Sequence, residues 1–101
     1  MKGIAMSSIK EVDVDNLLQV LVRIDNTQKM KSFLEDVFTI GEIRDSSQRL
    51  KVALMLDSGK SYIEIEKETG ASATTIARVS KCLNNGQDGY RVAINALKNK
   101  S

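Results

Sequence analysis

Apolar residues recur along this chain at the three- and four-residue spacing that is typical of amphipathic helices. After residues 1–12, which show no such pattern and are expected to be loose, a helix is predicted from about Asp13 onward. The stretch DNTQ interrupts the pattern and places Thr27 where it could cap a second helix. The apolar stripe of the first predicted helix consists of Leu17, Leu18, Leu21 and Ile24.

The second predicted helix has an apolar stripe that is broad for its length. Such a stripe can pack inside one chain or form the seam between two copies, and the spacing alone favours packing inside the chain. Its residues are Met30, Phe33, Leu34, Val37 and Phe38.

A capping-box spacing, a Ser or Thr three residues before a Glu, starts the next part of the chain. Thr39 and Glu42 predict a short helix that ends near Asp45, and Ser46 or Ser47 is positioned to cap a separate fourth helix. The residues of that helix expected to face inward are Leu50, Ala53, Leu54 and Leu56.

Glycines and caps predict where the remaining helices begin and end. Gly59 is placed to end the fourth helix in a left-handed conformation. Ser61 and Glu64 repeat the capping-box spacing, and Ile63 and Ile65 are expected to anchor the short helix that they start. That helix should end at Gly70.

Ser72 is expected to cap the next helix, which should reach about Asn84. A turn cluster, NNGQDG, separates it from a last amphipathic helix. The apolar residues of this last helix are Tyr90, Val92, Ala93, Ile94 and Leu97.

The helix after Ser72 has two distinct faces. On a helical wheel, Ile76, Val79 and Leu83 share one face, and the opposite face carries hydroxyl, amide and cationic side chains without a carboxylate. Such side chains can bond to base edges and phosphates. The residues of this outer face are Thr74, Arg78, Lys81 and Asn85.

Two short capped helices joined by a glycine turn predict a helix-turn-helix over about residues 61–84. A basic helix face alone is more often a solvated surface, but the glycine turn and the two consecutive caps favour DNA reading. Glu66 departs from the generic motif, which usually has a small residue at that position.

Composition narrows the function classes. The chain has 101 residues, no proline and 4% aromatic residues, so one all-α domain over residues 1–101 is expected. It has no histidine, and no nucleophile–base pair or metal-ligand spacing is evident, so we expect neither an enzyme nor a metal site. The lone Cys82 cannot form an internal disulfide and is expected to be a packed thiol. These features, and the lack of a membrane-spanning stretch, favour the cytoplasm.

Residues 33–85 resemble the tryptophan repressor superfamily, in particular its YerC/YecD-type branch. The most specific part is EKETGASATTIARVSKCLN. The resemblance implies an intertwined, all-α homodimer of a bacterial transcription regulator, whose helix-turn-helix units read a palindromic operator in double-stranded DNA. The residues we expect at the DNA are Ser72, Ala73, Thr74, Thr75, Ala77, Arg78 and Lys81.

The resemblance also implies a corepressor pocket, with Thr39, Arg49, Thr75 and Arg78 at positions that line the tryptophan site. Two neighbours differ, because Val79 replaces the family's glycine and Cys82 replaces its serine. A valine adds three carbons where the indole needs space, so we expect no tryptophan cofactor. The pocket is expected to be filled by side chains or to take a smaller effector, which the sequence does not identify.

A second reading of the residues stays open. The chain could be a helical, dimeric protein-interaction module whose basic face binds an acidic partner. The two readings differ in whether duplex DNA of one sequence is preferred over others.

Overall fold

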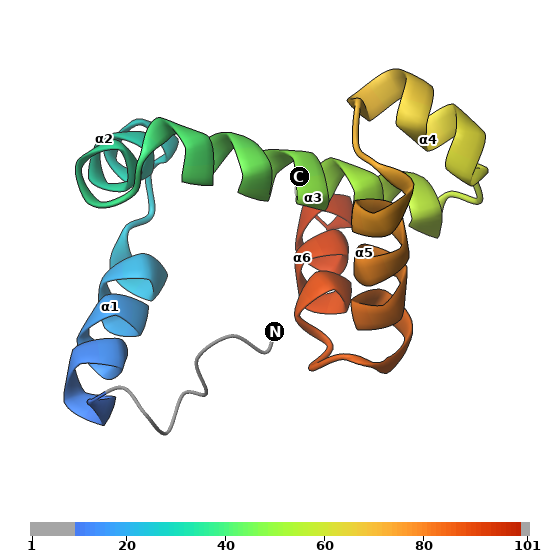
Figure 1. Cartoon of the computed structure of the whole chain (residues 1–101). Helices are drawn as coiled ribbons and strands as arrows, with labels where there is room; N and C mark the ends of the chain where they lie inside the picture. The colour runs from blue at the N-terminus through green and yellow to red at the C-terminus, as the bar shows by residue number, and fades with distance from the viewer. Residues whose placement is uncertain (1–9, 100–101) are drawn as a thin grey trace. The chain divides into compact units, whose positions relative to one another are not determined.

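The computed structural model describes residues 10–99, which form six α-helices and no strand (Figure 1). The all-α class predicted from the sequence is confirmed. The chain divides into two compact units, Met1–Thr39 and Ile40–Ser101. Most of the segment expected to be loose lies outside the described residues, and the first helix begins at Glu11.

The first unit contains α1 (Glu11–Arg23) and α2 (Thr27–Val37), and neither helix has a buried residue. The predicted apolar stripes are present but remain half-buried or exposed, with Leu18 49% and Val37 51% exposed. Nothing in the described chain therefore fully covers the apolar faces of these two helices.

The cap of α2 differs from the prediction. Asn26, not Thr27, is the N-cap: its extended backbone lets its side-chain oxygen accept a hydrogen bond from the Lys29 amide at 3.0 Å. Thr27 is the first residue inside the helix.

The second unit starts with α3 (Ile40–Asp57), one continuous helix of 18 residues. The predicted break near Ser46 and Ser47 is wrong. The Ser47 hydroxyl donates to the Ile43 carbonyl at 2.8 Å, a bond to the preceding turn of the same helix. A serine bonded in this way lies inside a helix and does not cap a new one.

Gly59 ends α3 as predicted. Its φ is +86°, and its amide donates to the Leu56 carbonyl while the Lys60 amide donates to the Met55 carbonyl. This pair of bonds is the Schellman arrangement, which satisfies the last carbonyls of a helix and reverses the chain.

Three further helices complete the second unit: α4 (Tyr62–Thr69), α5 (Ala73–Asn85) and α6 (Gly89–Lys98). In Figure 1, α4 lies near the C-terminal end of α3, while α5 and α6 run side by side and both pack on α3. The end predicted for α5 near Asn84 agrees with the observed end within one residue.

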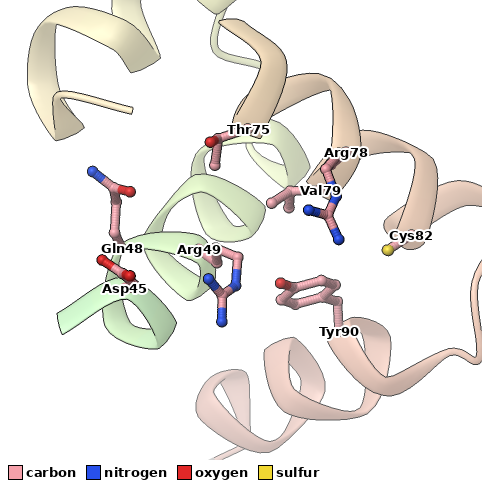
Figure 2. A pocket seen from close by; sticks show the side chains of 8 residues that line it. All are labelled: Asp45, Gln48, Arg49, Thr75, Arg78, Val79, Cys82 and Tyr90. Carbon is pink, nitrogen blue, oxygen red and sulfur yellow. The ribbon is translucent and has the colours of Figure 1, made fainter. Parts of the chain in front are cut away.

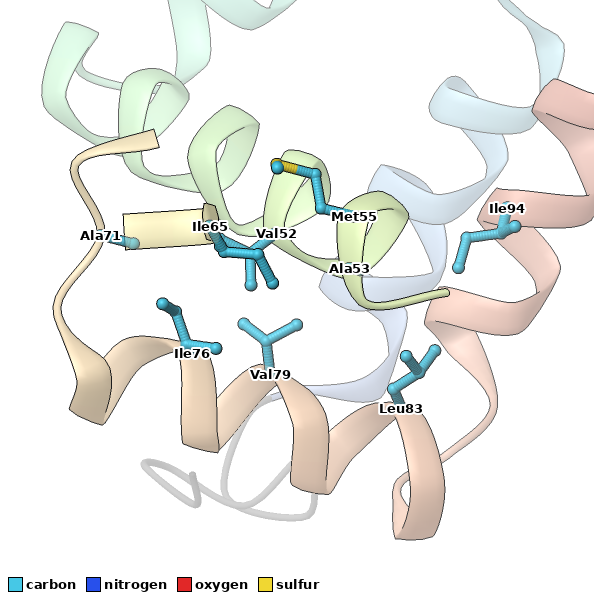
Figure 3. Close-up of a cluster of buried hydrophobic side chains, with 9 residues drawn as sticks. All are labelled: Val52, Ala53, Met55, Ile65, Ala71, Ile76, Val79, Leu83 and Ile94. Carbon is cyan, nitrogen blue, oxygen red and sulfur yellow. The ribbon is translucent and has the colours of Figure 1, made fainter. Parts of the chain in front are cut away.

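The core of the second unit is a cluster of small and medium aliphatic side chains from all four of its helices (Figure 3). Ile63 is not part of it, because this predicted anchor is 67% exposed and Ile65 alone of α4 is buried. The cluster consists of Val52, Ala53, Met55, Ile65, Ala71, Ile76, Val79, Leu83 and Ile94.

Two ion pairs connect α6 to the C-terminal end of α3. The Asp57 carboxylate accepts from Arg91 at 2.9 Å and from Lys98 at 3.1 Å. The hydrogen bond from Lys98, helped by the positive charges of both residues, lowers the pKa of Asp57 below its ordinary value.

Replacing Asp57 with asparagine should lower the free energy of unfolding at neutral pH. A carboxyl whose pKa is lowered by folding stabilises the protein above its unfolded pKa, and this contribution is lost as the pH falls through the folded value. The difference between wild type and Asp57→Asn should therefore shrink as the pH drops below about 3.8. Urea denaturation across pH measures it, with the exposed Asp25→Asn as matched control.

The turn between α4 and α5 gives a second prediction. Gly70 has a φ of +76° and space around its missing Cβ, so Gly70→Ala should cost about 1–2 kcal/mol through backbone strain alone. Gly89 has the same free space without a positive φ, so Gly89→Ala should leave stability unchanged or raise it by up to about 1 kcal/mol. Equal stability losses in the two variants, measured by urea denaturation, would contradict this account.

Candidate nucleic-acid interface

Helices α4 and α5 form a compact helix-turn-helix whose turn is Gly70–Ser72. Gly70 is left-handed, and its amide donates to the Glu66 carbonyl at 2.9 Å. The Thr69 hydroxyl donates to the Ile65 carbonyl at 2.7 Å and accepts from the Ala71 amide at 3.1 Å. These bonds occupy the polar backbone groups of the turn and fix the direction in which α5 leaves it.

Both helices of the motif are capped by the predicted serines. Ser61 and Glu64 form the capping box, with reciprocal bonds of 3.2 Å and 2.8 Å. Ser72 accepts from the Thr75 amide at 3.1 Å, and its hydroxyl donates to the Thr75 hydroxyl at 3.1 Å. Ser72, Ala73 and Thr74 at this end of α5 are exposed, so a phosphate can approach the amides that the cap does not use.

Two polar contacts join α4 to α3. The Gln48 side chain donates to the Thr69 carbonyl at 3.1 Å, and Lys51 forms an ion pair with Glu68 at 3.2 Å. An exposed ion pair contributes little, so the burial of Ile65 and the bond from Gln48 are the stronger of these contacts.

The outer face of α5 has the exposure that the helical wheel predicted. The predicted DNA-contact residues are all exposed except Thr75, which is half-buried, and α5 carries two cations and no carboxylate. That these side chains contact DNA stays a prediction. The exposed residues of the set are Ser72, Ala73, Thr74, Ala77, Arg78 and Lys81.

Two of the three carboxylates on α4 have a hydrogen-bond or ion-pair partner. The backbone and side-chain hydrogen bonds from Ser61 lower the pKa of Glu64, so this residue stays charged as part of its cap. Glu68 is paired with Lys51. Glu66 is exposed and forms no ion pair within residues 10–99, so it is the carboxylate of α4 that most opposes a nearby phosphate.

Behind the outer face, a hollow of about 360 Å³ opens between α3, α5 and α6 (Figure 2). We call it the α3–α5 pocket. Its α5 wall consists of residues spaced by three and four, so one stripe of the helix faces it. The pocket is lined by Asp45, Gln48, Arg49, Thr75, Arg78, Val79, Cys82 and Tyr90.

Five of the six residues predicted for the ligand pocket meet around this hollow: Arg49, Thr75, Arg78, Val79 and Cys82. Thr39, the sixth, belongs to the first unit, and its part in the pocket stays a prediction.

Sequence reasoning missed three lining residues. Asp45 and Gln48 lie on the same face of α3 as Arg49, and a continuous α3 would have revealed them. Tyr90 comes from α6, and no spacing in the sequence relates it to α5.

The prediction of a packed thiol is wrong for Cys82 within this chain, because the residue is exposed at the edge of the pocket. Its position on the wheel is adjacent to the buried stripe, but the neighbouring α6 does not cover it. Leu83, one residue later, takes the buried position instead.

Neither arginine of the pocket has an ion-pair partner in residues 10–99. Within residues 10–99, Arg49 makes one long hydrogen bond, to the Ser46 hydroxyl at 3.4 Å, and the Arg78 side chain makes none. Figure 2 shows both guanidinium groups near the Tyr90 ring.

The part of the chain that the structure describes has neither a metal-binding cluster nor a membrane-spanning helix. No group of three or more histidine, cysteine, aspartate or glutamate side chains there is placed to hold a metal ion. No helix there has the length and apolar character needed to cross a bilayer.

Comparison with known proteins gives consistent matches over nearly the whole chain. The family described as Trp repressor protein matches residues 12–98. Protein YerC of Bacillus subtilis (strain 168) is 39% identical over 93 residues, which cover 92% of this chain and 89% of YerC.

Two solved structures share the fold. One is a candidate Trp repressor from Staphylococcus aureus, with a TM-score of 0.86 and 31% identity, covering 98% of this chain and 99% of its own. The other is a TrpR-like protein from Eubacterium eligens ATCC 27750, with a TM-score of 0.85 and 38% identity, covering 94% of this chain and 98% of its own.

Proposed function

This chain belongs to the Trp repressor family of DNA-binding regulators, and on that premise we propose that it is a sequence-specific transcriptional regulator. It reads a palindromic operator as a homodimer in the bacterial cytoplasm and represses by occupying that site. It has no catalytic role.

The observation that carries this proposal is the outer face of α5. This helix is anchored by three buried side chains, Ile76, Val79 and Leu83, and its other side presents hydroxyls and cations to solvent. A helix held on one side and free on the other is what insertion into a major groove requires. The glycine turn and the two consecutive caps add support, because they fix where both helices of the motif begin and end.

The side chains of α5 suit distinct parts of a duplex. Thr74 and Arg78 reach outward from the first turns, where base edges are read, and the alanines can contact thymine methyl groups. Ser72 and Thr75 lie at the N-terminus of the helix, where backbone amides and the positive end of the helix dipole attract a phosphate. Lys81 lies further along, where it adds sequence-independent attraction to the backbone.

The homodimer is inferred from the first unit. The stripes of α1 and α2 leave large apolar side chains in contact with water, and soluble monomers rarely expose such continuous apolar surface. A second copy supplies a matching surface, because a two-fold interface uses the same patch on both partners. Two-fold symmetry in the protein then accounts for a palindromic operator.

Tryptophan is not the effector we propose. Val79 is 2% exposed, and its side chain fills space next to the reading helix. Accommodating an indole there would force a well-packed side chain to move, which typically costs about 1–3 kcal/mol.

Selection of bound duplexes from a random pool tests the reading function, and Arg78→Ala tests its central residue. The selection should return a palindromic consensus. If Arg78 bonds to a guanine, Arg78→Ala should weaken operator binding by about 1–3 kcal/mol and relax preference at one base pair in each half-site. Arg44→Ala, an exposed arginine of α3, is the matched control and should bind normally.

The outcomes separate the alternatives. An equal loss on operator and random DNA would identify Arg78 as a phosphate contact. No sequence preference in the selection would reject DNA reading and favour the module that binds an acidic partner.

Charging the apolar face of α2 tests the dimer. Wild type should have a mass in solution of twice 11.2 kDa, and Phe33→Glu should shift it toward 11.2 kDa because an unpaired carboxylate is costly in an apolar seam. Ser32→Glu places the same charge on the opposite, exposed face and should stay dimeric. Light scattering gives the mass and circular dichroism checks the helices. A dimeric Phe33→Glu, or a monomeric wild type, would reject this interface.

A further inference from the structure

We propose that α4 reads bases together with α5, through two residues that lie outside the DNA contacts predicted from the sequence. Ile63 packs on the methyl group of a thymine, and Glu66 accepts a hydrogen bond from the amino group of a cytosine. Both base groups lie in the major groove. This inference rests on the proposed function, because it adds a second reading element to the same DNA interface.

The contacts of α4 with α3 show which face of α4 is turned outward. Ile65 is buried in the core, and Glu68 forms an ion pair with Lys51 of α3 at 3.2 Å. Residues two apart on an α-helix are separated by about 160° around its axis, so Ile63 is nearly opposite Ile65. Glu66 is nearly opposite Glu68 for the same reason. Both side chains are therefore turned away from α3, and both are exposed, Ile63 at 67%.

The outer faces of α4 and α5 lie on the same side of the second unit. Ile76 and Val79 of α5 lie in one cluster with Val52 of α3, so the outer face of α5 is also turned away from α3 (Figure 3). Glu66 lies one helical turn before Gly70, whose amide donates to the Glu66 carbonyl. Its side chain is therefore close to the turn that leads into α5, and a duplex on the outer face of α5 also meets this part of α4.

The chemistry of Ile63 and Glu66 suits bases better than phosphates. A carboxylate repels a phosphate, and an aliphatic side chain has no donor to offer it. A carboxylate does accept from the cytosine amino group, and an apolar side chain does contact the thymine methyl group. A first helix that only crosses the DNA backbone would present donors at these two positions.

Glu66 is also the carboxylate of α4 that is free to make such a bond. The Glu64 side chain accepts from the Ser61 amide in the capping box, and Glu68 is paired with Lys51. Glu66 forms no ion pair within residues 10–99. A carboxylate without a partner can exchange water for a cytosine amino group without breaking a bond inside the protein.

The assignment of Glu66 is tested by repeating the selection of bound duplexes with variants of the full chain. The wild-type consensus should contain a cytosine in each half-site, and Glu66→Ala should relax that position while the others keep their preference. Exchanging that C·G pair for T·A should weaken wild-type binding by about fivefold or more and Glu66→Ala binding by less. Glu68→Ala removes the same charge from the α3 side of α4 and should return the wild-type consensus.

The assignment of Ile63 is tested by removing single methyl groups from the operator. Replacing the contacted thymine with uracil deletes only its methyl group, and wild-type affinity should fall by about fourfold. Ile63→Ala should bind the thymine and uracil operators within about twofold of each other, because the partner of the methyl group is gone. Val92→Ala, an equally exposed aliphatic residue on α6, is the matched control and should keep the wild-type difference.

The result that would overturn base reading by α4 is equally specific. If Glu66 only opposes phosphates, Glu66→Ala should tighten binding to the operator and to random duplexes by the same factor and leave the consensus unchanged. A uracil effect that is the same in wild type and Ile63→Ala at every thymine of the operator would reject the methyl contact.

This inference and the proposed function can fail separately. A wild-type palindrome that neither Glu66→Ala nor Ile63→Ala changes disproves only base reading by α4 and leaves reading by α5 in place. A wild type that prefers no duplex sequence disproves DNA reading as a whole, and this inference with it.

Discussion

The contact of Ile76 and Val79 with the side chains of α3 is the interaction on which the rest of the second unit depends. Both residues are essentially inaccessible to water, and together with Val52 and Ile65 they join α3, α4 and α5. Burial of each such side chain stabilises the fold by about 1.5–3 kcal/mol. Because this burial uses one face of α5, the opposite face is free, and its polar side chains stay in water at no cost.

The same packing places the α3–α5 pocket beside the outer face of α5. The stripe of α5 beside the buried face lines the α3–α5 pocket, and Thr75 and Arg78 border both the pocket and the outer surface. A ligand in the pocket would therefore touch the proposed reading helix directly. Tyr90 brings α6 into this arrangement, and Asp57 fastens that helix to α3.

The first unit differs from the second because no residue of its two helices is fully buried. The apolar stripes of α1 and α2 are as regular as those of α5, yet they stay in contact with water in one chain. A helix of this kind gains most of its stability from packing, not from intrinsic propensity. The proposed dimer would supply that packing and would place two copies of α5 in the symmetric relation that a palindrome needs.

The sequence by itself determined the local features. Ser61 and Ser72 cap their helices, and Gly59 and Gly70 turn the chain, because these effects depend on neighbours a few residues away. The spacing of apolar residues likewise identified the buried and exposed faces of α5, since helical geometry alone sets them.

Only the tertiary structure decided the features that depend on distant neighbours. Ser47 could cap a helix or lie inside one, and its bond within the continuous α3 decides which. Leu83 is buried in the same cluster as Ile94 of α6, whereas Cys82, one residue earlier, stays exposed. Tyr90 lines the pocket because α6 packs beside α5. The position of α6 follows from how whole helices pack together, and a pattern read along one helix contains no information about that.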